Sequence, residues 1–461
     1  MASSLTNQRP LHIIILAAGK GTRMHSSVPK VLHQLAGAPL LEHVVSTAKK
    51  LNPSQIHVVV GHGKQQVESA FEGEKIKFVD QAEQLGTGHA VQQAINAIDN
   101  DSNCLVLYGD VPLIAESTLQ SLVNSIDSFS LALLTSIVDD PTGYGRILRD
   151  ETNSACGIVE QKDATIEQCA INEINTGFLC ARTEKLKTWL QQIDNDNAQK
   201  EFYLTDIVKL AHDAGEPINT LQPTSDNEII GINNRVELAK VERIYQLSKA
   251  EQFMKSGVTV VDPNRLDIRG EVSIAEDTII DVNCVIIGKT EIDANVTIHP
   301  NCVISNSKIG SGTTIHANTV IENAIIGTSV NVGPFARIRP GTELGDEVRI
   351  GNFVETKNAK LKAGAKANHL SYVGDSEVGS NTNIGAGVIT CNYDGANKHK
   401  TKIGNDVFVG SDSQLVAPVT IEDGATIGAG STITNNVEKN QLAISRSRQR
   451  QIDGWKRPSK N

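Results

Sequence analysis

The 461 residues of this chain suffice for two or three domains, each with its own core, and a formal net charge of −10 argues against a general nucleic-acid binder. Seven cysteines, without a paired spacing or a CxxC motif, argue against a disulfide framework or a zinc site and predict free thiols in a reducing compartment. No apolar stretch reaches the length of a membrane span and no signal peptide precedes the first apolar run, so we expect a cytoplasmic protein with no membrane span.

A glycine-rich loop with several cations follows the first apolar run. Residues 11–16 are typical of a buried parallel strand, and the loop Leu16-Ala17-Ala18-Gly19-Lys20-Gly21-Thr22-Arg23-Met24 comes directly after it. Its two glycines allow a tight turn and the close approach of a ligand. Exposed backbone amides together with cations form a binding site for a polyphosphate. The alternative is an ordinary turn with scattered charge. The cations are Lys20, Arg23 and Lys30.

The spacing within this loop excludes two better-known motifs. A dinucleotide fingerprint needs Gly or Ala three residues after its second Gly, where Met24 stands. A Walker A loop needs Ser or Thr directly after its Gly-Lys pair, where Gly21 follows Lys20. The chain is therefore neither an obvious dehydrogenase nor a P-loop kinase. The loop instead resembles the signature loop of the sugar-nucleotide pyrophosphorylases, which join a nucleoside triphosphate to a sugar 1-phosphate and release pyrophosphate.

Strands and helical stretches alternate up to about residue 233. This alternation predicts a mostly parallel α/β sheet, which binds ligands at the carboxyl ends of its strands. A helix that bridges two domains follows at 234–257, because Asn234 can cap it, Glu237 stands at its third position and Gly257 can end it. The predicted strands are Ile13–Leu16, Ile56–Val60, Leu105–Leu107 and Leu131–Thr135, and the predicted helices are Gln92–Ile98 and Leu119–Ile126.

After Gly257, apolar residues recur at a step of six. Neither an α-helix nor an ordinary strand has this period, whereas in hexapeptide repeats three hexads form one triangular coil with the apolar residues inside. Small and turn-forming residues at the corners explain the 37 glycines. At about 18 residues a coil, the segment makes roughly nine coils of a β-helix. The ladder, with two one-residue slips, is Ile268, Ile274, Ile280, Ile286, Ile292, Ile298, Ile304, Ile309, Ile315, Ile321, Ile326, Val332, Ile338, Leu344 and Ile350, then Ile403, Val409, Leu415, Ile421, Ile427 and Ile433.

The ladder is broken between Ile350 and Ile403, and we expect function there. Two segments, 352–373 and 392–402, are rich in Lys, Asn and His. Insertions in a solenoid commonly carry function, and two insertions about one coil apart should lie close together on the prism. The alternative is a pair of solvated basic loops.

Two residues stand in contexts that suit metal binding and catalysis. Asp110 follows an apolar strand within Tyr108-Gly109-Asp110-Val111-Pro112. A carboxylate at this place can hold Mg²⁺ against phosphate oxygens. The alternative is that Asp110 only caps the end of the strand. His369, within Asn368-His369-Leu370-Ser371-Tyr372, lies in the broken part of the ladder, and a histidine that titrates near neutrality suits a general base.

Several longer motifs carry a family resemblance. They are the stretch Gln81 to Ala90, Gly143-Tyr144-Gly145-Arg146-Ile147, Ile158-Val159-Glu160-Gln161-Lys162, Asn175-Thr176-Gly177, Gly231-Ile232-Asn233-Asn234 and Asn352-Phe353-Val354-Glu355-Thr356-Lys357. Together with the two halves described above, they resemble the bacterial bifunctional N-acetylglucosamine-1-phosphate uridyltransferase / glucosamine-1-phosphate N-acetyltransferase family, from about Leu11 to Trp455.

The resemblance implies a fold and two reactions. It implies a Rossmann-like α/β nucleotidyltransferase domain at 1–233, a linker helix at 234–257, and a left-handed parallel β-helix of hexapeptide repeats with a C-terminal tail at 258–461. The second half would acetylate glucosamine 1-phosphate with acetyl-CoA. The first half would join the product, N-acetylglucosamine 1-phosphate, to UTP, giving pyrophosphate and UDP-N-acetylglucosamine for peptidoglycan and lipopolysaccharide. Mg²⁺ as cofactor and a homotrimer with shared acetyltransferase sites are implied as well.

The resemblance also implies site residues. For UTP and the UDP-sugar these are Leu16, Ala17, Ala18, Gly19, Lys30, Gln81, Gly86, Thr87, Tyr108, Gly109, Asp110, Gly145, Glu160, Asn175 and Asn233. Arg23 and Lys30 would offset phosphate charge, Asp110 and Asn233 would hold the metal, Gln81 would bind the uracil edge, and Gly86 would leave room for the ring. Arg339, Lys357, Tyr372, Asn383 and Lys398 would bind glucosamine 1-phosphate. Ala386, Asn392, Tyr393, Ser411, Ala429 and Arg446 would bind acetyl-CoA, with His369 as base and Glu355 to orient it or to hold the substrate ammonium.

Two other functions stay open for the second half. It could only oligomerise or regulate a single-activity nucleotidyltransferase, as in some glucose-1-phosphate pyrophosphorylases, or it could be a scaffold that presents flat faces to partners. The Lys, Asn and His set in the broken ladder argues against the first of these. The basic tail 445–450 is either a solvated end or a phosphate clamp for a neighbouring chain.

Overall fold

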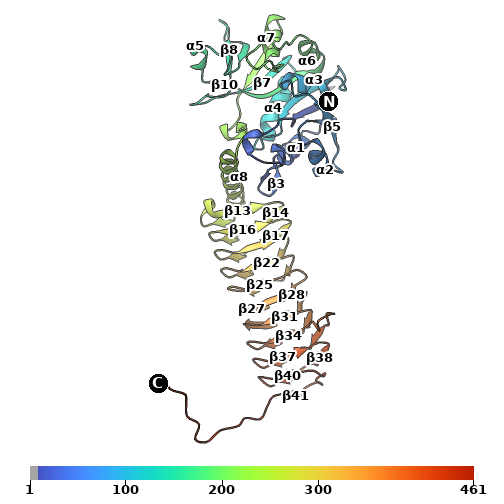
Figure 1. The fold of residues 1–461 in the computed structure, drawn as a ribbon, viewed down its shortest axis with the longest axis vertical. Coiled ribbons are helices and arrows are strands. Elements are labelled where there is room, and N and C mark those ends of the chain that lie inside the picture. The colour runs from blue at the N-terminus through green and yellow to red at the C-terminus, as the bar shows by residue number, and fades with distance from the viewer. Residues whose placement is uncertain (1–8, 461) are drawn as a thin grey trace, which may run out of the picture. The chain divides into compact units, whose positions relative to one another are not determined.

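The computed structural model describes residues 9–460, so residues 1–8 and 461 of the expected domain ranges lie outside the described residues. The chain divides into two compact units, residues 1–245 and 246–461, and the division falls within helix α8 (Arg235–Lys255) (Figure 1). Within residues 9–460, no helix is both long and apolar enough to cross a bilayer. All seven cysteines are free thiols, as the sequence predicts.

The first unit is built on one sheet that is parallel at its centre. Its strands are β1 (Leu11–Leu16), β4 (Gln55–Val60), β5 (Ile76–Asp80), β6 (Asn103–Tyr108), β7 (Leu131–Ile137), β8 (Gly145–Arg149), β9 (Ala155–Val159), β10 (Glu173–Arg182) and β11 (Ile218–Leu221). The order is β11-β7-β10-β6-β1-β4-β5, and β8 and β9 form a hairpin that pairs with β10. Because β1 is parallel to both β4 and β6, the loops after these three strands meet at one edge. The expected α/β fold is confirmed.

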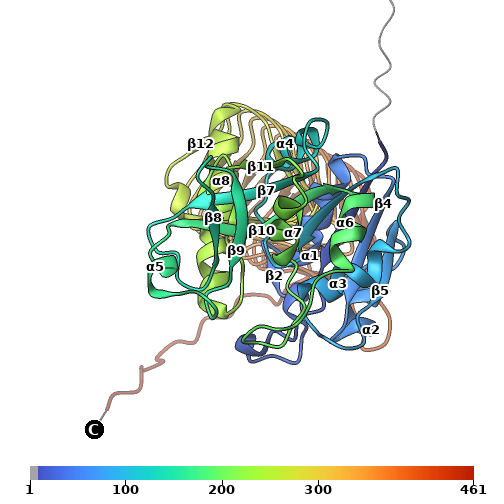
Figure 2. The same cartoon turned by 90° about the horizontal axis from the view of Figure 1, so that it is seen from above.

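Helices cover both faces of this sheet, because alternate residues of a buried strand point to opposite sides. The helices are α1 (Leu40–Lys50), α2 (Lys64–Ala70), α3 (Thr87–Ile95), α4 (Glu116–Ser125), α5 (Ile166–Cys169), α6 (Thr183–Leu190) and α7 (Asp206–Asp213). Ile13 and Ile15 share one apolar cluster with α1, α2 and α4, whereas Ile14 shares another with α3, α6 and α7. Figure 2 shows these helices around the strands of the sheet. Helices α3 and α4 begin earlier than the apolar pattern predicts, because their first turns are polar or glycine-containing.

Helix α8 begins where the sequence predicts. The Asn234 side-chain oxygen accepts hydrogen bonds from the backbone amides of Val236 and Glu237, both at 2.9 Å. The Glu237 carboxylate in turn accepts from the Asn233 amide at 2.6 Å. The cap therefore also holds the backbone of Asn233, a predicted metal ligand.

The second unit is a parallel β-helix with three sheets. The first runs from β12 (Thr259–Val260) to β41 (Leu442–Ala443) with 11 strands, the second from β13 (Leu266–Arg269) to β40 (Thr432–Ile433) with 10, and the third from β14 (Val272–Ile274) to β38 (Val419–Ile421) with 9. Neighbouring strands of one sheet belong to successive coils (Figure 1). Asparagines recur at the corners with positive φ, as at Asn283 (59°), Asn301 (63°) and Asn318 (60°), because Asn tolerates the left-handed region.

The predicted hexad ladder forms the interior of this β-helix. Every predicted member, from Ile268 to Ile433, is at most 8% exposed. Stacking these side chains coil upon coil makes one continuous apolar core. The hexapeptide reading of the spacing is confirmed.

Of the two insertions predicted in the break of the ladder, the first, at 352–373, is wrong, and the second, at 392–402, is confirmed. Parallel pairing continues without interruption through β25 (Arg337–Ile338), β28 (Glu355–Lys357), β31 (Tyr372–Gly374) and β34 (Ile389–Cys391). Threonine and alanine at some interior positions hid the period, so segment 352–373 is a regular coil. Between Ile350 and Ile403, only residues 392–400 loop out of the ladder, and within them Tyr393 and Lys398 form a bridge. The interior residues of this region, all buried, are Thr356, Leu361, Ala367, Val373, Val378, Ile384 and Thr390.

Candidate active sites

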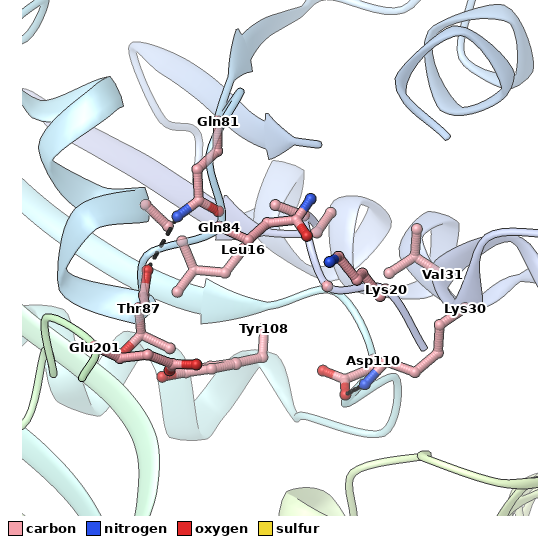
Figure 3. Close-up of a pocket in the computed structure, with 15 residues that line it drawn as sticks. Leu16, Lys20, Lys30, Val31, Gln81, Gln84, Thr87, Tyr108, Asp110 and Glu201 are labelled. Atoms are coloured by element: carbon pink, nitrogen blue, oxygen red, sulfur yellow. Dashed lines mark hydrogen bonds and ion pairs between the residues drawn. The ribbon is translucent and has the colours of Figure 1, made fainter. Parts of the chain in front are cut away.

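A cavity of about 510 Å³ lies in the first unit, at the carboxyl ends of β1 and β6 (Figure 3). Figure 3 shows Gln81 and Thr87 toward one end and Lys30 with Asp110 toward the other. Glu201 also lines the cavity; it lies in no motif, and only the fold brings it to this edge. Of the predicted site residues, the cavity brings together Leu16, Ala17, Ala18, Gly19, Lys30, Gln81, Gly86, Thr87, Tyr108 and Asp110.

At one end of the cavity, polar groups from distant parts of the chain meet. The Lys30 ammonium contacts Asp110 Oδ2 and lies 3.3 Å from Asn233 Oδ1. Arg23 Nη2 donates to the same Asn233 oxygen at 2.9 Å. The Asp110 and Asn233 oxygens therefore converge on one position that already attracts a cation.

Convergent carboxylate and amide oxygens fit a hard divalent cation. Mg²⁺ commonly takes one or two protein oxygens and completes its octahedron with waters and phosphate oxygens. Among residues 9–460 no group of three or more His, Cys, Asp and Glu side chains could hold a metal by itself. A metal at Asp110 and Asn233 would therefore depend on the phosphates of a bound substrate.

The other end of the cavity is shaped by Gln81 and the start of α3. Gln81 is 3% exposed, and its Nε2 donates to the Gly86 carbonyl at 3.0 Å and lies 3.1 Å from His89 Nδ1. Gly86 has a φ of 113°, and a Cβ there would lie 2.5 Å from the Phe202 carbonyl oxygen. Glycine is thus required by the crossing backbone of Phe202. Gly86 also lines the cavity, and that it leaves room there for a flat ring stays a prediction.

The predicted sugar-contacting residues stand outside the lining of this cavity. A Cβ on Gly145 would lie 3.3 Å from Glu160 Oε1, and that oxygen accepts from Thr205 Oγ1 at 3.2 Å. Burial removes solvent from the Glu160 carboxyl and thereby raises its pKa. Asn175 Oδ1 accepts from the backbone amide of Gly177 at 3.1 Å. The structure therefore brings all three together, because Asn175 on β10 is the cross-strand partner of Gly145 on β8, and Gly145 lies beside Glu160.

A buried cation holds the loop beside Gly145. Arg146 is 1% exposed, and no carboxylate among the described residues pairs with it. It donates to the Tyr144 carbonyl and, at 2.7 Å, to Gln161 Oε1, which also accepts from the Gly143 amide at 3.1 Å. Its Nε has no hydrogen-bond partner in the described part of the chain. These bonds tie the loop before β8 to the residue that follows Glu160.

In the second unit, His369 lies on β30 (Lys366–His369) directly beside Asn352 of β27 (Arg349–Asn352). His369 Nδ1 lies 3.0 Å from Asn352 Oδ1. With that oxygen as acceptor, Nδ1 carries the proton and Nε2 is the basic nitrogen of the neutral ring. Asn352, rather than Glu355, therefore orients the ring, since Glu355 pairs with Arg339 at 2.6 Å.

Three predicted phosphate-binding cations lie close to one another in the second unit. Lys357 on β28 and Lys398 in the loop between β34 and β35 (Thr401–Ile403) face one another, and this repulsion lowers the pKa of Lys357. Arg339, from the preceding coil, adds to that effect. Facing cations without an equal number of carboxylates favour binding of an anion.

The predicted acetyl-CoA residues mostly follow one corner of the β-helix. The Ala386 carbonyl accepts from the Asp412 amide and the Ser411 carbonyl from the Gly430 amide, both at 2.8 Å, so successive coils stack here. Arg446 Nη1 donates to the Ala429 carbonyl at 2.7 Å. Tyr393 stands apart from this column and is 60% exposed, and Asn383 lies on β33 (Asn383–Ile384).

Family models match both units. The MobA-like NTP transferase domain matches residues 13–157. In the β-helix, the GMPPB C-terminal domain matches residues 268–361 and the bacterial transferase hexapeptide (six repeats) matches residues 400–435.

Known proteins align along nearly the whole chain. The Bifunctional protein GlmU of Marinobacter nauticus is 53% identical over 451 residues, which cover 98% of this chain and 99% of that protein. The Bifunctional protein GlmU of Idiomarina loihiensis is 54% identical over 448 residues, which cover 97% of this chain and 98% of that protein. Among solved structures, a UDP-glucose pyrophosphorylase complexed with UDP-glucose covers 51% of this chain and 98% of its own, with 17% identity and a TM-score of 0.44.

Proposed function

Because this chain belongs to the family of the bifunctional GlmU proteins, we infer that its two units carry out two successive steps of UDP-N-acetylglucosamine synthesis. The left-handed β-helix acetylates the amine of glucosamine 1-phosphate with acetyl-CoA. The α/β unit transfers uridylyl from UTP to N-acetylglucosamine 1-phosphate and releases pyrophosphate, and its product feeds cell-wall synthesis. The observation that carries this inference is that the alignment with a single GlmU protein spans both units. An NTP transferase model matches the first unit, and a hexapeptide model matches the second.

For the first reaction, UTP occupies the 510 Å³ cavity with its base toward Gln81 and its phosphates toward Lys30. The phosphate oxygen of the sugar attacks the α-phosphorus in line, and the bond to pyrophosphate breaks. Arg23 and Lys30 offset negative charge on the transferring and leaving groups. No protein nucleophile is needed, because catalysis here depends on positioning and electrostatics.

Asp110 and Asn233 would hold Mg²⁺ at the phosphate end of this cavity. A bound Mg²⁺ supplies charge that stabilises phosphate oxygens in the transition state. The support is the convergence of the two side-chain oxygens on the position that the Lys30 ammonium contacts.

For the second reaction, His369 Nε2 takes the proton that the substrate amine loses as it attacks the thioester carbonyl. A C–N bond forms, the C–S bond breaks, and coenzyme A leaves as a thiol once it is protonated. Asn352 keeps the imidazole in the tautomer that can accept this proton. Lys357, Lys398 and Arg339 bind the sugar phosphate, and the corner at Ala386, Ser411 and Ala429 binds coenzyme A.

The homotrimer is supported by an apolar column at one corner of the β-helix. The rings of Phe335 and Phe353 stack with centroids 5.4 Å apart, and these residues are 50% and 56% exposed. Leu370, which follows His369, is 61% exposed. All three have positive φ (55°, 55° and 48°), where apolar side chains are unfavourable. An exposed and strained apolar column fits burial against the same column of another copy, and it would bring that copy next to His369. The co-substrates UTP and acetyl-CoA and the seven free thiols suit a cytoplasmic location.

A product assay by mass spectrometry tests both activities. The purified protein receives glucosamine 1-phosphate, acetyl-CoA, UTP and Mg²⁺, with each omitted in turn. We expect UDP-N-acetylglucosamine only with all components, and N-acetylglucosamine 1-phosphate when UTP alone is left out. If UDP-N-acetylglucosamine formed only from pre-acetylated sugar phosphate, the β-helix would have an oligomerising or regulatory role instead of acetyltransferase activity.

A further inference from the structure

A buried carboxylate without an assigned role stands among the acetyltransferase residues. Asp375 follows β31 and is 7% exposed. Its φ of 46° equals that of Asn306, Asn323 and Asn358, which occupy the same corner on other coils. An aspartate therefore stands where this corner elsewhere uses asparagine or glycine, and it does so beside Tyr372, Lys357 and Asn392.

The contacts of Asp375 explain why a carboxylate is required. Asn358 Nδ2 donates to one carboxylate oxygen at 2.6 Å, and Asn392 Nδ2 donates to the other at 2.5 Å. An asparagine at this position could not accept both bonds, because one of its two terminal atoms is an NH₂ donor. Asp375 thus joins the amides of the coil before it and of the loop after it.

The same contacts fix which way the Asn392 amide faces. Asn392 Nδ2 donates to Asp375 and also lies 3.4 Å from Tyr372 Oη, so both amide hydrogens have partners. The Asn392 Oδ1 is left as an acceptor, and no residue within 9–460 donates to it. Without the Asp375 carboxylate, no acceptor would hold Asn392 Nδ2 at this position, and the amide could equally adopt the flipped orientation.

The negative charge of Asp375 also faces the predicted phosphate cations. Its backbone amide donates to the Lys357 carbonyl at 2.9 Å, so the two residues are adjacent across coils. Lys398 lowers the pKa of Lys357, and the Asp375 carboxylate opposes that shift. Asp375 therefore offsets part of the repulsion that Lys357 experiences from Lys398.

We propose that Asp375 is a positioning residue of the acetyltransferase centre, which holds the Asn392 amide so that its Oδ1 accepts a hydrogen bond from an N–H group of a bound substrate. The proposal rests on the acetyltransferase function of this unit. Two substrates carry such a group: the amino sugar has its amine, and coenzyme A has the amides of its pantetheine arm. Steady-state kinetics distinguish them, because the KM that rises belongs to the substrate that donates.

The test is Asp375→Asn, which keeps the shape of the side chain but replaces one acceptor by a donor. We expect kcat/KM for acetyl transfer to fall by about 10- to 100-fold, the cost of one misplaced buried hydrogen bond. Uridylyl transfer by the other unit of the same molecules should not change, and it controls for protein concentration and quality. Thermal unfolding of the variant should stay close to that of the wild type.

Two further variants separate positioning from a merely structural role. Asn323→Ala changes the same corner at the same φ, away from the site, and should leave both activities intact. The double variant Asp375→Asn/Asn392→Asp exchanges donor and acceptor across the contact and restores an acceptor at position 392. If Asp375 acts by positioning Asn392, kcat/KM for acetyl transfer should be several-fold higher in the double variant than in Asp375→Asn.

Three results would overturn the proposal. The first is wild-type kcat/KM in Asp375→Asn. The second is a loss of activity that tracks a loss of thermal stability in both Asp375→Asn and Asn323→Ala. The third is the lack of any recovery in the double variant. A wild-type protein that fails to acetylate glucosamine 1-phosphate would instead overturn the proposed function, and this inference with it.

Discussion

Single side chains decide where charge gathers in this molecule. In the first unit, Lys30 bridges Asp110 and Asn233 at the phosphate end of the cavity. In the second unit, Lys357 and Lys398 face one another and are only partly balanced by Asp375. Under the proposed function, both arrangements hold cations in place before a polyphosphate or a sugar phosphate binds, and such preorganisation reduces the cost of binding an anion.

The first prediction at this scale concerns Asp110. Asp110→Asn keeps the side-chain volume and removes the negative charge that a metal needs. We expect uridylyl transfer to fall by about 100-fold or more, because charge at the phosphates is then uncompensated. Acetyl transfer by the same preparation should be unchanged. Uridylyl transfer at the wild-type rate and with wild-type Mg²⁺ dependence would show that the metal site is misassigned.

The second prediction concerns His57, which is 2% exposed on β4 and whose Nδ1 lacks a hydrogen-bond partner among the described residues. Burial, with the charges of His12 and Lys77, lowers its pKa from 6.5 to about 4. The folded state therefore keeps His57 neutral, whereas the unfolded chain takes up a proton below pH 6.5. Stability falls as the pH drops from 6.5 to 4, by up to about 3 kcal/mol.

His57→Gln removes this titration. Calorimetric unfolding of the α/β unit should show a smaller decrease in Tm between pH 7 and pH 5 for the variant than for the wild type. Parallel Tm profiles over this range would show that His57 does not contribute to acid sensitivity.

At the scale of elements, the β8–β9 hairpin is the part of the first unit on which the predicted sugar contacts depend. It carries Gly145, and Glu160 follows its second strand. Arg146 and Gln161 tie the two ends of the hairpin together, and Asp150 at its turn contacts α7. The hairpin is therefore held at its base by a buried cation and at its tip by an ion pair.

The third prediction tests the buried cation at the base. Arg146→Met removes the hydrogen bonds to Gln161 and Tyr144, so Gly145 and Glu160 lose their fixed spacing. We expect KM for N-acetylglucosamine 1-phosphate to rise by about 10-fold while KM for UTP changes little. Arg149→Met on the same strand is the matched control, because Arg149 pairs with Glu173 instead. Equal effects of both variants would mean that only hairpin stability matters.

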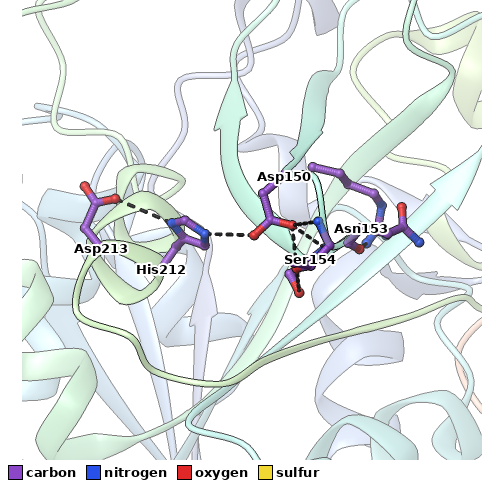
Figure 4. A network of polar contacts seen from close by, with 7 residues as sticks. Asp150, Asn153, Ser154, His212 and Asp213 are labelled. Carbon is purple, nitrogen blue, oxygen red and sulfur yellow. Dashed lines mark hydrogen bonds and ion pairs between the residues drawn. The ribbon is translucent and has the colours of Figure 1, made fainter.

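The fourth prediction tests the ion pair at the tip (Figure 4). Asp150 Oδ1 accepts from the amides of Thr152 at 2.8 Å and Ser154 at 3.0 Å, and Oδ2 lies 3.1 Å from His212 Nε2. The Thr152 hydroxyl, the Ser154 amide and His212 lower the pKa of Asp150 to about 2. Asp150 and Asp213 raise the pKa of His212 above its usual 6.5.

The sign of each shift gives a pH window. The contribution of His212 is present below pH 6.5 and is lost as the pH rises through its folded pKa, whereas that of Asp150 is lost as the pH falls below 3.8 toward 2. The contact is therefore strongest between about pH 4 and 6.5. His212→Gln should lower Tm more at pH 5.5 than at pH 8.5. An equal decrease in Tm at pH 5.5 and at pH 8.5 would show that the positive charge of His212 does not contribute to stability.

At the scale of the whole molecule, the faces of the β-helix differ in character. The outward side of the third sheet carries ion pairs such as Glu291 with Lys308 and Glu343 with Lys360, both at 2.7 Å. The corner with Phe335, Phe353 and Leu370 is apolar and exposed. Charged sheet surfaces discourage association, so the apolar corner is the part that another copy would cover.

The fifth prediction follows from this difference. Phe353→Glu should convert the proposed trimer to monomers in light scattering, and acetyl transfer should fall with it while uridylyl transfer persists. Ile325→Glu is the matched control, because Ile325 is 54% exposed on the charged third sheet. A wild-type chain that is monomeric, or a Phe353→Glu variant that stays trimeric, would contradict the assigned interface.

Sequence alone determined the class of each unit and the family. A step of six residues has one physical solution, a three-sided coil that buries the repeated residue, so the β-helix could be predicted without any contact information. In the first unit, the apolar run and the glycine-rich loop after it predicted a phosphate-binding edge of the sheet. This was possible because the backbone freedom of glycine and the charges of the loop are properties of residues that are adjacent in the sequence. The long motifs then indicated the two activities.

Only the tertiary structure decided how distant residues meet. The interior roles of Thr356 and Ala367 depend on pairing with neighbouring coils, which a hydrophobic period cannot reveal. Gly86 is required by the backbone of Phe202, and Asn352 rather than Glu355 orients His369. These contacts join segments that are far apart in the sequence or lie on different coils. Local pattern records propensity and periodicity, whereas such contacts exist only once the chain has packed.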